Sequence, residues 1–205
     1  MSTPAVFPSP DVLDLLAAFG ARRLTVAQYH TMHDAGILME GDRVELLDGY
    51  LVEKPMRNPP HDVTLQRLNK RLVRLGLVGW EVRTQSAVTF QGSEPEPDGA
   101  VVRGDEATYA TRHPGPGDFG LIVEVSDSSL QFDRKVKGKM YAEVGVPVYW
   151  VVNVADQQVE VYTDPDPAAT PPAYRTRTDF RPGQDVPVVL DGAAVAAVPV
   201  AELLP

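Results

Sequence analysis

The stretch that decides the fold runs from residue 119 to residue 154 and reads FGLIVEVSDSSLQFDRKVKGKMYAEVGVPVYWVVNV. Its two ends, Phe119–Ser126 and Val148–Val154, are apolar runs of the kind expected for strands that are buried on both faces. Between them, the sequence from about Arg134 to Glu143 predicts a helix, which a glycine and a proline shortly afterwards would end. The stretch therefore predicts two core strands of a sheet joined by a helix.

Further strands are predicted on both sides of this stretch. Alternating β-formers indicate a strand from Val82 to Phe90, and Asp98–Val102 and Val159–Thr163 have similar patterns. Weaker strand patterns, at Tyr174–Thr178 and Val186–Leu190, occur in a tail rich in Pro and Ala. The order of these elements predicts an α/β protein whose mixed β-sheet is flanked by helices.

Helices are predicted in the first third of the chain. Ser9-Pro10-Asp11 is typical of a helix start and predicts a short helix that ends at Gly20. Thr25 followed by Gln28 resembles a capping box, which would open a second helix. Leucines at 65, 68, 72 and 75 form one apolar stripe and predict a helix from His61 to Leu75.

A hairpin is predicted between the second of these helices and the third. Two strand-like runs, 43–47 and 50–53, flank the dipeptide Asp48-Gly49. Asp-Gly supplies the two residues with positive φ that a type I′ turn requires. We therefore expect a tight antiparallel hairpin here.

Composition limits the classes of protein that remain. The chain has 205 residues, a formal net charge of −9 and no cysteine. This length suits one compact domain, and the absence of cysteine excludes disulfides, Cys-ligated zinc and thiol nucleophiles. No apolar run approaches the roughly 18 residues of a membrane span, and the N-terminus lacks the pattern of a secretory signal. We therefore expect a cytoplasmic protein with no membrane partner.

Lys137 is the most informative single residue. If Val136 is placed at 0° on a helical wheel, the apolar side chains of the helix centre at about 65°, and Lys137 falls at about 100°, inside the apolar arc. A lysine that points into a core needs an anionic partner or loses its proton. The wheel alone also fits the alternative, a lysine that snorkels from the edge of the apolar stripe.

Three acidic residues are candidate partners for Lys137. Glu124 interrupts the apolar run of Phe119–Ser126, where a carboxylate is costly unless it is paired or bound to a metal. Asp98 follows a proline and opens a strand, although an isolated Pro-Asp is commonly just a turn. Glu45 alternates with apolar neighbours, and taken alone it predicts a solvent-facing strand residue. Together, three carboxylates and a lysine suit a hard cation such as Mg²⁺, for which Mn²⁺ is expected to substitute.

Several motifs occur in a fixed order along the chain. They are RVELLDG at 43–49, PPH at 59–61, PD at 97–98, EVS at 124–126, and D-x-x-x-K-x-x-x-Y-x-x-x-GVPVYW at 133–150. In this combination the chain resembles the Uma family of putative restriction endonucleases, within the PD-(D/E)XK nuclease superfamily. The resemblance extends from about residue 24 to residue 162 and implies a restriction-endonuclease-like core.

The resemblance implies roles for individual residues. Asp98 corresponds to the first catalytic, metal-binding acid and Glu124 to the second, while the carbonyl of Val125 adds a backbone ligand. Ser126 stands where the superfamily motif has lysine, and the family moves that lysine to the next helix, here Lys137. Glu45 is implied as a further acid near the metal. Three residues are expected next to the site rather than in the chemistry: His61, Tyr141 and Ser126.

The same resemblance implies cleavage of DNA by metal-assisted hydrolysis. Basic side chains on the helix His61–Leu75 are candidate phosphate contacts, although a solvated helix face explains them equally well: Arg67, Lys70, Arg71 and Arg74. Because many nucleases of this class pair two active sites to cut two strands, we expect a homodimer. The chain is then divided into a leader with a short helix (1–23), a nuclease-like domain (24–163) and a Pro-rich extension packed on that domain (164–205).

Two other functions stay open at this point. The net charge of −9 favours a non-catalytic module on the same fold, which binds nucleic acid or a partner protein. An acidic metal-dependent hydrolase that acts on a small phosphate ester would need a closed pocket instead of an open groove. The presence of all three acids together with Lys137 favours the nuclease.

Overall fold

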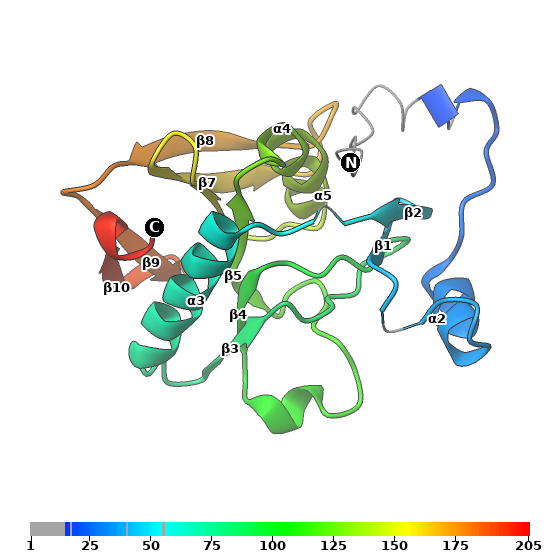
Figure 1. Cartoon of the computed structure of the whole chain (residues 1–205), viewed down its shortest axis with the longest axis horizontal. Helices are drawn as coiled ribbons and strands as arrows, with labels where there is room; N and C mark the ends of the chain where they lie inside the picture. The colour runs from blue at the N-terminus through cyan, green and yellow to red at the C-terminus, as the bar shows by residue number, and fades with distance from the viewer. Residues whose placement is uncertain (1–14, 17, 40, 55) are drawn as a thin grey trace.

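A six-stranded mixed sheet forms the centre of the molecule (Figure 1). The computed structural model describes residues 15, 16, 18–39, 41–54 and 56–205. The strands lie in chain order across the sheet, and only β5 and β6 run parallel, while all other neighbours are antiparallel. The strands are β3 (Trp80–Thr84), β4 (Gly99–Arg103), β5 (Phe119–Ser126), β6 (Val148–Asn153), β7 (Gln158–Asp166) and β8 (Ala173–Phe180). The predicted α/β fold class is confirmed.

The two parallel strands form the buried middle of the sheet, as their apolar sequences predict. Every residue of β5 and of β6 is buried. The connection between them is helical over residues 130–143, as α4 (Leu130–Phe132), a π-helical segment (Asp133–Lys137) and α5 (Gly138–Glu143). The expected regular helix from about Arg134 is therefore wrong in its start and in its geometry. The carbonyl of Asp133 accepts the Gly138 N–H, which is the i→i+5 bond of a π turn, and also the Tyr149 hydroxyl at 3.0 Å.

Different elements cover the two faces of the sheet. One face packs against the helix α3 (Pro59–Arg74), through Leu68 and Leu72, and against the hairpin of β9 (Asp185–Leu190) and β10 (Ala193–Pro199). The other face packs against α5 through Tyr141. Because side chains alternate along a strand, Leu121 and Val123 face α3, while Ile122 faces α5. Glu124 therefore points to the side of α5.

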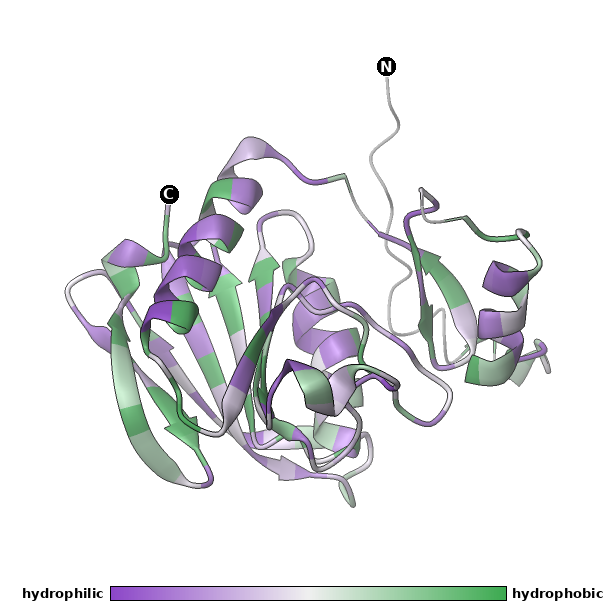
Figure 2. Ribbon diagram, turned by 90° about the horizontal axis from the view of Figure 1, so that it is seen from below, coloured by the Kyte–Doolittle hydropathy of each residue, from purple (hydrophilic) through white to green (hydrophobic). Residues whose placement is uncertain are grey.

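A second hairpin and a helix lie at the end of the molecule opposite β9 and β10 (Figure 2). The hairpin consists of β1 (Val44–Leu47) and β2 (Tyr50–Glu53), and its turn residues Asp48 and Gly49 have φ of 49° and 79°. This is the predicted type I′ geometry. The capping box of Thr25 and Gln28 is also present and opens α2 (Val26–Asp34).

Some predicted boundaries differ from those observed. The strand expected from Val82 to Phe90 ends at Thr84, because Gln85 has φ of 45° and turns the chain out of the sheet. Strand β10 was not expected, since its alanines have weak β-propensity. The short helix expected to end at Gly20 lies mostly outside the described residues. None of the helices described is long and apolar enough to cross a membrane.

Candidate active site

Asp98 and Glu124 lie next to each other on neighbouring strands. The register of β4 and β5 pairs Gly99 with Val123, so the preceding residue on one strand faces the following residue on the other. Ala100, two residues after Asp98, lies on the face covered by α5, as Glu124 does. The two acids therefore share one face of the sheet, although 26 positions separate them in the sequence.

The Asp98 carboxylate is held through both of its oxygens. Oδ2 accepts the backbone N–H of Val125 at 2.9 Å and lies 3.3 Å from Nε2 of His61, while Oδ1 accepts Nε2 of Gln85 at 3.1 Å. Burial opposes ionisation of Asp98, but the hydrogen bond and charge of His61 and the Val125 N–H outweigh it and lower its pKa. Asp98 is therefore an ionised acceptor with a fixed orientation.

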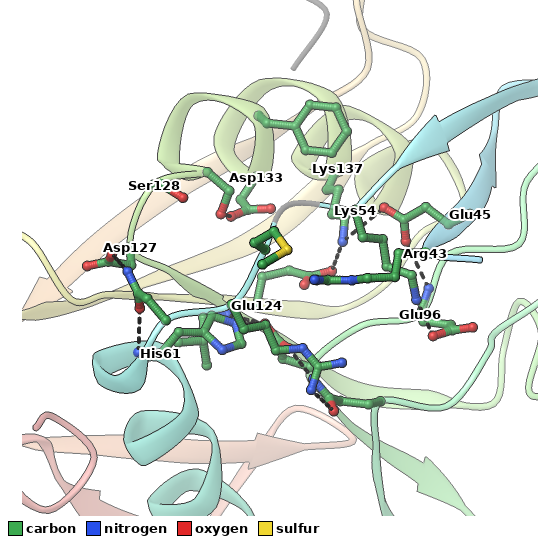
Figure 3. Close-up of a pocket in the computed structure, with 18 residues that line it drawn as sticks. Arg43, Glu45, Lys54, His61, Glu96, Glu124, Asp127, Ser128, Asp133 and Lys137 are labelled. Atoms are coloured by element: carbon green, nitrogen blue, oxygen red, sulfur yellow. Dashed lines mark hydrogen bonds and ion pairs between the residues drawn. The ribbon is translucent and has the colours of Figure 1, made fainter. Parts of the chain in front are cut away.

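Lys137 extends from the π-helical segment into the site, where Figure 3 shows it between two acids. Its side chain is only 8% exposed, and Nζ lies 2.9 Å from Oε1 of Glu124 and 3.5 Å from Oε1 of Glu45. Glu124 Oε1 also accepts the Tyr141 hydroxyl at 2.7 Å. Lys137 is thus buried against carboxylates and does not snorkel.

Glu45 does not face the solvent, although its strand pattern taken alone predicted that it would. It is 3% exposed and not solvent-facing, and its Oε2 accepts the backbone N–H of Glu96 at 3.1 Å. The reason is that β1 is covered on this side: Leu46 bridges to Glu94, and Leu47 packs against Phe132 next to the π-helical segment. Alternation along one strand shows two faces but not which neighbours cover them.

Burial shifts the pKa values of the charged groups in the site. Burial raises the pKa of Glu124 to about 8, because the attraction of Lys137 is outweighed by desolvation and by the charges of Asp98, Asp133 and Glu45. Burial likewise raises the pKa of Asp133 to about 6. Burial lowers the affinity of Lys137 for its proton, but Glu124 and Glu45 more than offset this and raise its pKa well above the usual value. Lys137 is therefore a firm ammonium, while the nearby buried carboxyl groups of Glu124 and Asp133 resist ionisation.

These side chains line a cavity of about 70 Å³, which is large enough for several water molecules. Its lining includes Asp98, Glu124, Lys137, Glu45 and His61. His61 comes from the first turn of α3, which Asn58 caps by accepting the His61 N–H. Burial opposes protonation of His61, but Asp98 outweighs this and raises its pKa. Five segments distant in sequence thus contribute to one cavity.

Comparison with known proteins identifies the family of this chain and agrees with its fold. A family model described as "Uma2: Putative restriction endonuclease" matches residues 26–196. The chain belongs to the Uma2 family. A crystal structure of a putative nuclease belonging to DUF820, from Anabaena variabilis, has a similar fold with a TM-score of 0.60. It is 17% identical, and the match covers 82% of this chain and 94% of that one. A search of curated proteins finds no match.

Sequence reasoning missed several groups in the cavity of this Uma2 chain. Asp133 is 3% exposed, and its Oδ2 accepts the hydroxyls of Ser126 and Ser129, each at 2.5 Å. Its spacing of four residues from Lys137 was the available signal, since such pairs share one side of a helix. Basic side chains also line the cavity: Arg43, Lys54 and Arg57. Ser126 itself holds Asp133 and has no lysine-like role.

The basic residues of α3 lie away from the cavity in the described part of this Uma2 chain. None of Arg67, Lys70, Arg71 and Arg74 is among the lining residues. Two of them bind the C-terminal segment: Arg67 donates to the carbonyl of Leu204, and Arg71 pairs with Glu202 at 2.9 Å. Lys70 and Arg74 remain exposed to solvent.

The donor set of the cavity fits Mg²⁺. Among the described residues no three His, Asp or Glu side chains are grouped as ready metal ligands. Mg²⁺ commonly binds through one or two carboxylates and keeps several waters, so Asp98 and Glu124 suffice. The carbonyl of Val125 points to the same edge of β5 as its N–H, which donates to Asp98. A divalent cation would favour the ionised form of Glu124, which burial opposes in its absence.

Proposed function

We propose that this chain is a Mg²⁺-dependent endonuclease that hydrolyses phosphodiester bonds in DNA. One observation carries the proposal: Asp98, Glu124 and Lys137 converge in one cavity, with Lys137 Nζ 2.9 Å from Glu124 Oε1. Membership in a family described as "Putative restriction endonuclease" supports it. Asp98, Glu124 and the carbonyl of Val125 would hold the ion, with Glu45 beside them.

The ion, when bound, would polarise the phosphate and lower the pKa of a water molecule. Lys137 contributes a charge instead of accepting a proton, because Glu124 and Glu45 raise its pKa. A fixed ammonium of this kind stabilises the negative charge that builds up on a phosphate during attack. Tyr141 and Glu45 hold this arrangement through Glu124 and Lys137.

The test is cleavage of plasmid DNA in Mg²⁺ or Mn²⁺ by variants that remove single groups. Lys137→Met and Glu124→Gln should each lower the cleavage rate by about 10²-fold or more, because the first removes the positive charge that would stabilise the transition state and the second removes a carboxylate that would hold the ion. Lys135→Ala is the matched control, because Lys135 lies on the same helical segment and is exposed. Wild-type cleavage by either of the first two variants would refute the assigned roles.

A non-catalytic module is the second candidate, and the net charge of −9 favours it. Calorimetric titration with Mn²⁺ separates the two functions. Metal binding that is present in the wild type and lost in Asp98→Ala supports the nuclease. No binding in either protein supports a module that binds nucleic acid or protein.

In the nuclease, a homodimer would pair two cavities for cleavage of both strands, and sedimentation of the wild type tests that assembly.

A further inference from the structure

Gln85 has an unusual backbone conformation at the edge of the cavity. Its φ of 45° lies in the left-handed region, which residues other than Gly, Asn and Asp rarely adopt. At this point the chain leaves β3, and the Gln85 N–H donates to the carbonyl of Asp98 at 3.3 Å. Unfavourable conformations of this kind persist only where the surroundings impose them, and they gather at functional sites.

The Gln85 amide links two groups of opposite charge. Its Oε1 accepts Nη1 of Arg57 at 2.8 Å, and its Nε2 donates to Oδ1 of Asp98 at 3.1 Å. A guanidinium has only donors and an ionised carboxylate has only acceptors. The amide between them can therefore satisfy both in one orientation alone. Arg57 fixes that orientation from the exposed edge of the cavity.

We infer that Gln85 is the positioning residue for Asp98, and that Arg57 holds Gln85 in place for this task. Val125 and His61 contact Oδ2 of Asp98, so Gln85 supplies the contact on Oδ1 that fixes the plane of the carboxylate. The inference deepens the proposed function and rests on it. Groups that orient a metal-binding carboxylate in this way typically change metal affinity by 10- to 100-fold when they are removed.

The test compares Gln85→Met with the wild type, because methionine has a similar length and lacks the amide. In metal-free crystals, the Asp98 carboxylate should rotate away from its wild-type orientation in the variant. In calorimetry, Gln85→Met should bind Mn²⁺ about tenfold more weakly. Gln91→Met, which removes an exposed glutamine elsewhere, is the control and should change neither measurement.

A second variant keeps the inference testable if Gln85→Met does not fold. Arg57 is exposed, so Arg57→Met should fold, and it should weaken Mn²⁺ binding in the same direction but less, because the amide stays and loses only its fixed orientation. An unchanged Asp98 orientation, or unchanged Mn²⁺ affinity where Asp98→Ala abolishes binding, would overturn the inference. If the wild type binds no Mn²⁺, the proposed function fails instead, and the orientation of Asp98 in the crystals decides on Gln85.

Discussion

At the scale of single residues, the site brings an unusual number of buried carboxyl groups together. Glu45, Glu124 and Asp133 are each 3% exposed, Asp98 lies beside them, and the buried ammonium of Lys137 contacts both Glu45 and Glu124. Burying carboxylates without full compensation opposes folding. The residues that do the proposed chemistry therefore reduce the stability of the metal-free protein, a common property of active sites.

The burial of Glu124 predicts that the metal-free protein loses stability as the pH rises from about 5 to 8. The pKa of Glu124 is raised to about 8 in the folded chain, so the folded state holds a proton that the unfolded state has already released. The free energy of unfolding, measured by urea denaturation in a chelator, should fall over this range. Glu124→Gln should flatten that fall, because glutamine does not titrate. Parallel pH profiles for the two proteins would contradict the raised pKa of Glu124 as the cause of this fall.

At the scale of elements, the π-helical segment that carries Lys137 is anchored to β7 by a second ion pair. Nε of Arg134 donates to Oε2 of Glu160 at 2.9 Å, and Glu160 also accepts from Asn153 and Tyr162 at 2.9 and 2.7 Å. Glu160 is fully buried, so these donors replace the water it lost. The anchor fixes one side of the segment while Lys137 extends from it into the cavity.

The anchor predicts a large, acid-sensitive contribution to stability. Burial alone would raise the pKa of Glu160, but its hydrogen bonds, that from Arg134 foremost, lower it to about 2. Glu160→Gln should cost about 3 kcal/mol at pH 7, and the difference should disappear as the pH falls from about 4.5 towards 2. Denaturation at pH 7 and pH 3 measures this. Asp191→Asn, which removes an exposed ion pair with Arg103, should cost under about 1 kcal/mol at either pH. Equal losses in the two variants would contradict the anchor.

The elements also show which parts of the structure the sequence could predict. Strand β5 was predictable because its run of apolar residues needs no knowledge of neighbours, and Glu124 stood out against it. The π turn was not, since a wheel at 100° per residue assumes regular geometry, whereas the Asp133 carbonyl bonds to Gly138 and Tyr149. Lys137 was still placed correctly because its apolar neighbours turn with it.

At the scale of the whole molecule, contacts between distant segments decide what local patterns leave open. Glu45 is buried because the loop before β4 and the segment after β5 close over β1, and nothing within residues 44–47 encodes that closure. In the same way, the basic stripe of α3 is regular in sequence, but the C-terminal segment binds Arg67 and Arg71. Long-range contacts of this kind therefore occupy two of the four basic side chains of the predicted binding face.

The arrangement of the whole molecule leads to a prediction for DNA binding. The cavity lies at the start of α3, and at 1.5 Å per residue Lys70 and Arg74 are roughly 14 and 20 Å further along the helix than His61. A duplex whose scissile phosphate enters the cavity can follow α3 and place other phosphates near these two side chains. Each phosphate contact lowers the slope of log affinity against log salt concentration by about 0.9.

We therefore expect Lys70→Ala/Arg74→Ala to reduce the magnitude of that slope by up to about 2, and Arg57→Ala by up to about 1. Fluorescence anisotropy of a duplex at several salt concentrations measures this, in the Glu124→Gln background to prevent cleavage. Arg175→Ala on β8 is the control, because its side chain is 67% exposed and lies outside the cavity lining. A change with Arg57→Ala alone would limit DNA contact to the edge of the cavity. An unchanged slope in every variant would contradict phosphate binding on this face. A non-catalytic module would then explain a chain with a net charge of −9 better than a nuclease does.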